Sequence, residues 1–148
     1  MSNALSDNRV ENLLAAAHAA AAHAYVPYSH FPVGAAVLLA DGSVVTGCNV
    51  ENASYGLTVC AERNAIFAAV AAGHREIRAV AVAAPRAMGT TPCGACRQVL
   101  NEFKPANDDL IVVLEGRDGP DVTTLGALLP RAFGPIDLDR ASDEGDAI

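Results

Sequence analysis

Three of the four cysteines occur in a pattern that could hold a catalytic metal ion. Glu62 follows Cys60 by two residues, and Cys93 and Cys96 form a Cys-x-x-Cys pair. Positions three apart on a helix lie about one turn apart, so both sulfurs of the pair face the same way. Three protein ligands leave the fourth position of Zn²⁺ open for water, which is the arrangement of a catalytic site. The pattern therefore predicts one Zn²⁺ per chain, held by Cys60, Cys93 and Cys96.

Two charged residues after Cys60 fit the chemistry of such a site. Three thiolates outweigh the charge of Zn²⁺, and an electron-rich metal lowers the pKa of its water poorly. Arg63 lies one helical turn after Cys60 and can direct its guanidinium toward the sulfurs. Glu62 need not be a ligand, and near the open metal position it can carry protons between the water and a substrate. We therefore predict Glu62 as the catalytic residue and Arg63 as the compensating charge.

A Cys-x-x-Cys pair also occurs in structural zinc knuckles and in redox pairs. A structural zinc site needs a fourth ligand, and Cys48 is the remaining cysteine. We expect Cys48 to pack inside a strand as a small apolar residue. The catalytic interpretation is favoured because Glu62 and Arg63 have no task in a zinc knuckle, although Arg63 could be an ordinary surface residue of its helix. Arg97 follows the second ligand pair and is assigned no role.

The composition of the 148 residues favours a small, uncharged substrate. The formal net charge is −7, and residues 137–148 contribute five acidic residues against one arginine. An acidic chain without a basic stripe is poorly suited to a phosphate backbone, so we expect no nucleic-acid partner. The sequence contains neither an apolar run long enough to span a bilayer nor an opening signal peptide. We therefore expect no membrane partner, a cytoplasmic location and reduced thiols.

Hydrophobic patterning predicts alternating helices and strands that would carry these residues. Asn8 and Glu11 resemble a capping box at the start of the first helix, and Asp41-Gly42 is a strong hairpin turn. The expected helices cover residues 8–24, 59–72, 92–103 and 124–129, and the expected strands cover residues 33–40, 43–49, 77–84 and 110–114. The zinc ligands therefore fall near the starts of the second and third helices.

The order of these elements predicts one α/β domain over residues 1–135, followed by an acidic tail, residues 136–148, that we expect to be disordered. Strand–helix–strand units give right-handed parallel crossovers, so helices should cover both faces of one mixed sheet. Two helices that follow adjacent strands could bring all three thiolates to one edge of the sheet. The positive ends of both helices would favour thiolate over thiol.

Several segments resemble the small homotetrameric cytidine deaminases of bacteria and animals. The resemblance covers roughly residues 26–135 and includes Cys60-Ala61-Glu62, Pro92-Cys93-Gly94-Ala95-Cys96, and residues 27–36 and 47–57. A non-ligand glutamate followed by a Pro-Cys-x-x-Cys pair is a signature of zinc nucleobase deaminases. Cysteine at the first ligand position, where the larger two-domain deaminases have histidine, is typical of the small tetrameric branch. The resemblance implies a three-layer α/β/α sandwich with a central five-stranded mixed sheet.

The resemblance also implies an activity and an assembly. The reaction would be hydrolysis of free cytidine, 2′-deoxycytidine or both to uridine or deoxyuridine and ammonia, in pyrimidine salvage. Glu62 would take a proton from the water that attacks C4 of cytosine, and would then protonate N3 and the leaving amine. The implied assembly is a homotetramer whose active sites are shared between subunits.

The substrate-binding residues are also given by the resemblance. Asn49 and Glu51 would bind the ribose hydroxyls, and residues two apart on an extended chain do point the same way. A carboxylate acceptor such as that of Glu51 suits a hydroxyl donor. Phe31 would lie against the nucleoside, and the backbone of Ala61 would help to hold the base. Phe133 of a neighbouring subunit would stack on the pyrimidine, with packing of Phe133 in its own core as the alternative.

Other members of the zinc deaminase class remain as alternatives. A blasticidin-type deaminase of a modified cytosine nucleoside would share the zinc core and differ around the sugar. A deoxycytidylate deaminase would need phosphate contacts and normally a histidine ligand, and polynucleotide editing needs a basic or aromatic surface. A zinc-stabilised module without catalysis would be indifferent to replacement of Glu62 by Gln.

Overall fold

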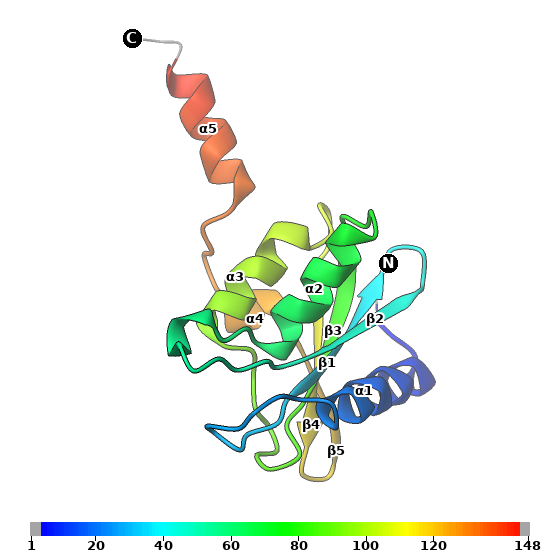
Figure 1. The fold of residues 1–148 in the computed structure, drawn as a ribbon. Coiled ribbons are helices and arrows are strands. Elements are labelled where there is room, and N and C mark those ends of the chain that lie inside the picture. Colours follow the sequence, from blue (N-terminus) through cyan, green and yellow to red (C-terminus); the bar gives the residue numbers. More distant parts are fainter. Residues whose placement is uncertain (1–3, 146–148) are drawn as a thin grey trace.

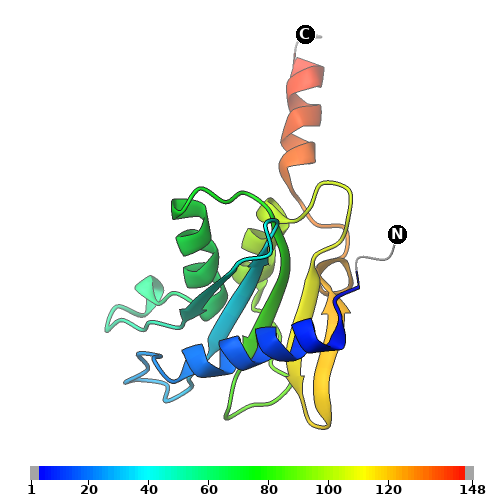
Figure 2. The same cartoon turned by 90° about the vertical axis from the view of Figure 1, so that its right-hand side faces the viewer.

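A mixed five-stranded sheet lies between two layers of helices in the computed structural model, which describes residues 4–145 (Figures 1 and 2). The strands are β1 (Gly34–Leu39), β2 (Val44–Cys48), β3 (Ile77–Ala83), β4 (Ile111–Gly116) and β5 (Gly119–Thr124). Their order across the sheet is β2-β1-β3-β4-β5, with β3 and β4 parallel and the other neighbours antiparallel. The predicted α/β/α sandwich with a five-stranded sheet is therefore confirmed.

The helices divide between the two faces of the sheet. They are α1 (Asp7–Ala21), α2 (Ala61–Ala71), α3 (Gly94–Phe103), α4 (Leu125–Leu128) and α5 (Pro135–Gly145), with a 3-10 turn, η1, at Tyr55–Leu57. α1 covers one face, whereas α2 and α3 lie side by side on the other (Figure 2). Within residues 4–145, none of the helices combines the length and apolar character needed to cross a bilayer.

Strand β1 is buried on both faces, which explains its continuous apolar sequence. Its alternate side chains enter two different core clusters because successive residues of a strand point to opposite faces. Ala35, Val37 and Leu39 pack with the residues of α2 and α3. Ala36 and Leu38 pack with the residues of α1.

Two glycines allow helices to approach the sheet closely. A Cβ added at Gly47 of β2 would lie 2.5 Å from the backbone nitrogen of Ala65 and 2.6 Å from the carbonyl oxygen of Ala61, both in α2. A Cβ at Gly34 would overlap the carbonyl oxygen of Ala17 in α1. The absence of a side chain at Gly47 therefore sets how closely α2, which carries candidate site residues, packs on the strand.

The first helix and the last strand differ from the sequence predictions. Ser6, and not Asn8, is the N-cap of α1, and its hydroxyl accepts a hydrogen bond from the Arg9 amide at 3.3 Å. The patterning had indicated no strand at β5, because the segment contains a glycine, a proline and polar residues. Such a sequence is tolerated here since β5 pairs with β4 alone and forms an edge of the sheet.

The C-terminal segment also differs from the sequence expectation. Residues 135–145 form α5, where a frayed tail was expected, and α5 projects away from the sheet (Figure 1). Pro135 occupies the first helical position, which its fixed φ angle favours. The Asp137 carboxylate accepts a hydrogen bond from the Gly134 amide at 2.8 Å, and an acid in the first turn suits the helix dipole. Residues 146–148 lie outside the described residues.

Candidate metal centre and active site

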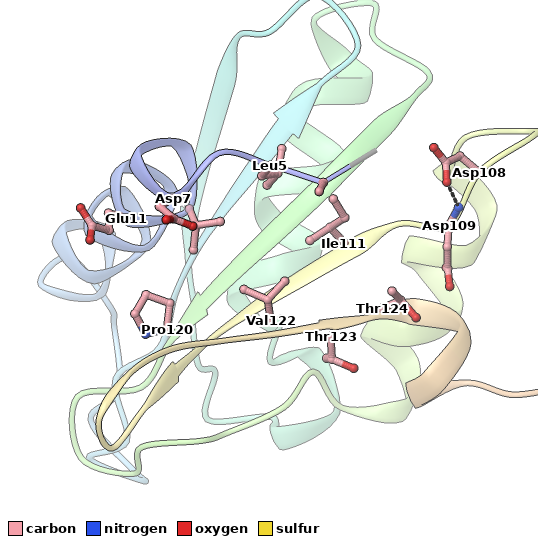
Figure 3. Close-up of a pocket in the computed structure, with 12 residues that line it drawn as sticks. Leu5, Asp7, Glu11, Asp108, Asp109, Ile111, Pro120, Val122, Thr123 and Thr124 are labelled. Atoms are coloured by element: carbon pink, nitrogen blue, oxygen red, sulfur yellow. Dashed lines mark hydrogen bonds between the residues drawn. The ribbon is translucent and has the colours of Figure 1, made fainter. Parts of the chain in front are cut away.

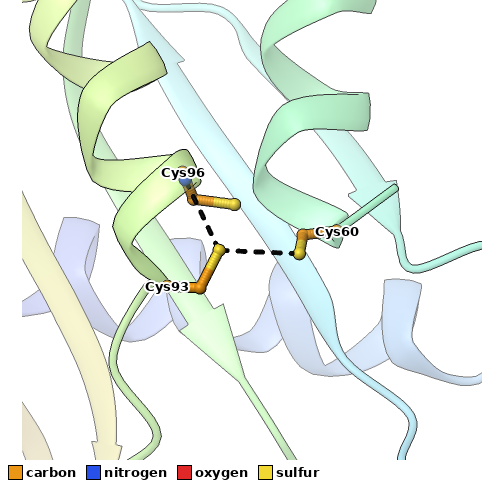
Figure 4. Close-up of side chains that lie close together, drawn as sticks. All are labelled: Cys60, Cys93 and Cys96. Atoms are coloured by element: carbon orange, nitrogen blue, oxygen red, sulfur yellow. Dashed lines mark hydrogen bonds between the residues drawn. The ribbon is translucent and has the colours of Figure 1, made fainter. Parts of the chain in front are cut away.

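The three predicted cysteine ligands lie together at the starts of α2 and α3 (Figure 4). Their sulfur atoms all lie within 4.8 Å of one another, and the Sγ atoms of Cys60 and Cys93 are 3.7 Å apart. Tetrahedral coordination with Zn–S bonds of about 2.3 Å places two sulfurs about 3.8 Å apart. The spacing of the sulfurs therefore fits a Zn²⁺ ion. Cys48, the alternative fourth ligand, is not part of this cluster.

The positions of the sulfurs follow from the ends of two helices. Cys60 is the N-cap of α2 and Cys93 is the N-cap of α3, while Cys96 lies in the first turn of α3. The Sγ of Cys93 accepts a hydrogen bond from the Cys96 amide at 3.5 Å. Helix N-termini carry partial positive charge and free N–H groups, so both helices stabilise anionic sulfur. Thiolates are the form of cysteine that binds metals.

Cys60 is the cysteine of the cluster whose thiol ionises most readily. Its pKa is lowered to about 5, mainly by the neighbouring Cys96 thiol and also by Arg63. The guanidinium of Arg63 donates to the Sγ of Cys60 at 3.4 Å, and its role as a compensating charge stays a prediction. The same proximity to Cys60 raises the pKa of the Cys96 thiol, and burial adds to this effect. Because metals bind thiolates, binding of a divalent metal would release the protons of the thiols that hold it.

Glu62 lies in the first turn of α2 and is only 4% exposed. Burial is the main reason that the pKa of its carboxyl group is raised above the ordinary value, and the nearby Cys60 thiolate adds to this effect. A raised pKa makes the carboxyl group a better proton acceptor than an ordinary glutamate, which suits a group that must take up and return a proton. The position and burial of Glu62 are compatible with proton transfer, and its catalytic role stays a prediction.

Comparison with known proteins identifies the family. The family described as "Cytidine and deoxycytidylate deaminase zinc-binding region" matches residues 7–113. The chain belongs to this cytidine deaminase family. The family match and the three-cysteine cluster together confirm the prediction of one zinc site per chain.

Relatives in the family match nearly the whole chain. A cytidine deaminase from Sporosarcina psychrophila is 48% identical over 136 residues, covering 91% of this chain and 98% of the relative. One from Halalkalibacterium halodurans is 52% identical over 117 residues, covering 78% of this chain and 87% of the relative. The crystal structure of a cytidine deaminase from Burkholderia pseudomallei is 48% identical, with a TM-score of 0.76 and coverage of 90% of this chain and 100% of that chain.

Asn49 holds the loop that precedes β1. The resemblance to cytidine deaminases predicts that this residue also binds the ribose. Its Oδ1 accepts a hydrogen bond from the Val33 amide at 2.8 Å, and its Nδ2 donates to the Phe31 carbonyl at 2.9 Å. Asn49 thereby fixes the backbone on both sides of Pro32. Phe31 is half-buried in this loop. Contact of Asn49 and Phe31 with a nucleoside stays a prediction.

Glu51 holds the preceding part of the same loop. Its Oε2 accepts hydrogen bonds from the amides of Tyr28 at 3.0 Å and Ser29 at 3.2 Å, and its Oε1 contacts the Ser29 hydroxyl. These contacts, chiefly that with the Ser29 hydroxyl, lower the pKa of the Glu51 carboxyl group. Asn49 and Glu51 therefore both reach toward residues 28–33, as their spacing by two predicts.

Phe133 lies outside the core, which removes the alternative of core packing. Its side chain is 60% exposed, while its carbonyl oxygen accepts hydrogen bonds from Gln98 at 2.7 Å and Asn101 at 3.1 Å. Two side chains of α3 therefore hold the backbone of Phe133, while the residue stays exposed at the surface. Ala61, the other predicted contact, is buried at the first position of α2, next to the Cys60 ligand.

Two residues of the site were not found by sequence reasoning. Asn64 donates to the Cys48 carbonyl at 2.8 Å and so ties α2 to the end of β2. Arg97 donates three hydrogen bonds around the turn that carries Cys93. Two of the three acceptors of Arg97, and both acceptors of Asn64, are backbone carbonyls, which any residue type provides. No residue pattern in the sequence could have indicated these contacts.

A cavity of about 630 Å³ lies on the other face of the sheet, between the start of α1 and strand β5 (Figure 3). Leu5, Val10, Ile111 and Val122 contribute apolar side chains to its lining. Val10 and Ile111 belong to the core cluster beneath α1. The cavity marks where α1 leaves the edge strand partly uncovered, and it is separate from the cysteine cluster.

Proposed function

We propose that this chain catalyses the hydrolytic deamination of free cytidine and 2′-deoxycytidine to uridine and deoxyuridine. The observation that carries the proposal is the buried Glu62 carboxyl group beside three clustered cysteine sulfurs. Relatives named cytidine deaminase match the chain over most of its length, which supports the same reaction. The net charge of −7 disfavours phosphorylated substrates through electrostatic repulsion and leaves free nucleosides as the substrate class.

The residues of the site divide the chemistry between them. Zinc, when bound by Cys60, Cys93 and Cys96, makes a water molecule acidic enough to act as the nucleophile. Glu62 takes a proton from this water as the new C4–O bond forms, and gives it to N3 of the ring. Glu62 then carries a second proton from the attacking oxygen to the amino group, the C4–N bond breaks, and ammonia leaves.

The remaining residues orient the substrate. We assign the ribose hydroxyls to Asn49 and Glu51, whose side chains already hold the loop at residues 28–33. The ring of Phe31 and the backbone of Ala61 would flank the nucleoside. This assignment follows the family resemblance and agrees with the common direction of the two polar side chains.

The direct test is to incubate the purified chain with cytidine, deoxycytidine and cytidine monophosphate, and to follow ammonia and the deaminated products. We expect turnover of both nucleosides, much slower turnover of the monophosphate, and about one zinc per chain. Bound zinc without turnover of either nucleoside would instead favour a blasticidin-type substrate. Preferred turnover of the monophosphate would contradict the assignment to free nucleosides.

We further propose that the chain works as a homotetramer with active sites shared between subunits. Phe133 is 60% exposed, although a lone aromatic ring gains nothing from solvent exposure. Tyr55, Leu57 and Phe67 are also at least half exposed on or near the elements that carry the zinc ligands. Exposed large apolar side chains on or near these elements support a protein interface there.

Replacement of Phe133 by Ala tests the shared site. Stacking of a base on an aromatic ring contributes about 1–3 kcal/mol, so we expect kcat/KM for cytidine to fall by about 5- to 150-fold. Light scattering and dilution assays should show that the wild-type chain loses activity as tetramers dissociate. Full activity of a monomer, or an unchanged kcat/KM in the Ala variant, would contradict a shared site.

A further inference from the structure

The guanidinium of Arg97 connects three segments around the metal centre. Its Nε donates to the Pro92 carbonyl at 2.7 Å, and its Nη2 donates to the Thr91 hydroxyl at 2.9 Å. Its Nη1 donates to the carbonyl of Leu128, the last residue of α4, at 2.6 Å. One half-buried side chain therefore fixes the turn that leads into Cys93 and attaches this turn to α4.

Cys93 is the ligand that most needs such support. Cys96 is fully buried and is held by packing, and Cys60 is half-buried with Arg63 on its sulfur. Cys93 is exposed, so the position of its sulfur depends on the backbone of its turn. The Pro92 carbonyl that Arg97 holds belongs to the peptide group immediately before Cys93.

The contacts of Arg97 differ from those of an ordinary ion pair. Among the residues whose side chains the structure describes, 4–142, no carboxylate forms an ion pair with Arg97. Its three acceptors are neutral and are arranged around one planar group, a geometry that suits the fixed fork of a guanidinium. A lysine at this position has one ammonium nitrogen and could not reach all three acceptors from one place.

We propose that Arg97 is a positioning residue that holds the Thr91-Pro92 turn against α4 and thereby retains Cys93 on the metal. The proposal rests on the zinc site of the proposed function but not on the identity of the substrate. Groups that orient metal ligands from behind typically change metal affinity by about 10- to 100-fold when they are removed. Loss of Arg97 should therefore be seen first in the rate at which the metal leaves.

The test is zinc release from the loaded chain into excess chromophoric chelator, for the wild type and for Arg97→Gln, Arg97→Lys and Thr91→Val. We expect release about 10- to 100-fold faster in Arg97→Gln. Arg97→Lys should be nearly as fast as Arg97→Gln, because it keeps the charge but not the three contacts. Thr91→Val removes a single acceptor and should give a smaller acceleration. The cobalt-substituted Arg97→Gln variant should show an altered thiolate-to-metal absorption band.

Arg78→Gln is the matched control, because Arg78 lies on the surface of β3 and its removal changes the net charge equally. Its release rate should equal that of the wild type. A wild-type release rate in Arg97→Gln, or full recovery in Arg97→Lys, would overturn the positioning role. If Arg97→Gln does not fold, an unchanged release rate in Thr91→Val would overturn the positioning role of Arg97. Because release needs no substrate, a failure of the proposed deaminase activity would be recognised separately.

Discussion

Replacement of Glu62 by Gln is expected to reduce the rate of cytidine deamination by about 10²- to 10⁴-fold while the chain keeps its zinc. The amide is close to the carboxylate in size, so the buried position of this 4%-exposed residue stays filled. The amide cannot accept a proton from water and return it to the base, and the proposed reaction needs this transfer more than once. Initial rates, metal analysis and circular dichroism on the same sample test the expectation.

Glu102→Gln serves as the control for this variant. Glu102 is an exposed glutamate of α3, and its replacement makes the same change in charge without touching the site. We expect wild-type kinetics in this control. Full activity in Glu62→Gln would show that Glu62 is not the proton carrier. Joint loss of zinc and activity would instead indicate that Glu62 supports the metal centre.

Replacement of Cys96 by Ala is expected to abolish zinc binding and activity together. Two sulfurs would remain, fewer than the three protein ligands of a catalytic zinc site. Since metal binding is linked to folding, the variant should also unfold at a lower temperature than the zinc-loaded wild type. Metal analysis after gel filtration and thermal unfolding with and without added zinc measure both effects.

Cys48→Ala is the matched control for the cysteine variant. Cys48 lies at the end of β2, outside the sulfur cluster, so this variant should keep about one zinc per chain. Retention of zinc by Cys96→Ala, or loss of zinc by Cys48→Ala, would mean that the ligands differ from Cys60, Cys93 and Cys96. Added zinc should raise the unfolding temperature of the metal-free wild type but not that of Cys96→Ala.

The elements that could be predicted from the sequence are those with a strong local pattern. The apolar runs of β1, β3 and β4 indicated buried strands. The spacing of apolar residues indicated α2, and Pro92 indicated the start of α3. β5 was missed because an edge strand receives its order from its single neighbour and needs no apolar run. α5 was missed because its polar, acidic sequence resembles that of a solvated tail.

In the site too, features that depend on nearby residues could be predicted, whereas contacts between distant residues could not. The sequence revealed the three cysteines, Glu62 and Arg63 because their chemistry depends on residue type and short spacing. The role of Asn49 and Glu51 in holding residues 28–33 could not be predicted, because it depends on how this loop folds back beside residues 49–51. The contact of Arg97 with Leu128 joins residues 31 positions apart. Its acceptor is a backbone carbonyl, which every residue type has, so the sequence cannot indicate it.

A chain whose metal ligands begin two separate helices acquires its metal late in folding. Cys60 and Cys93 are 33 residues apart, and their sulfurs meet only when α2 and α3 pack on the same face. On that face the site also depends on the pairing of β3 with β1, a contact between residues far apart in the sequence, and closing such a long loop costs entropy. During synthesis, a nascent chain that ends before residue 96 lacks a complete ligand set, so zinc is captured only after most of the sheet has been made.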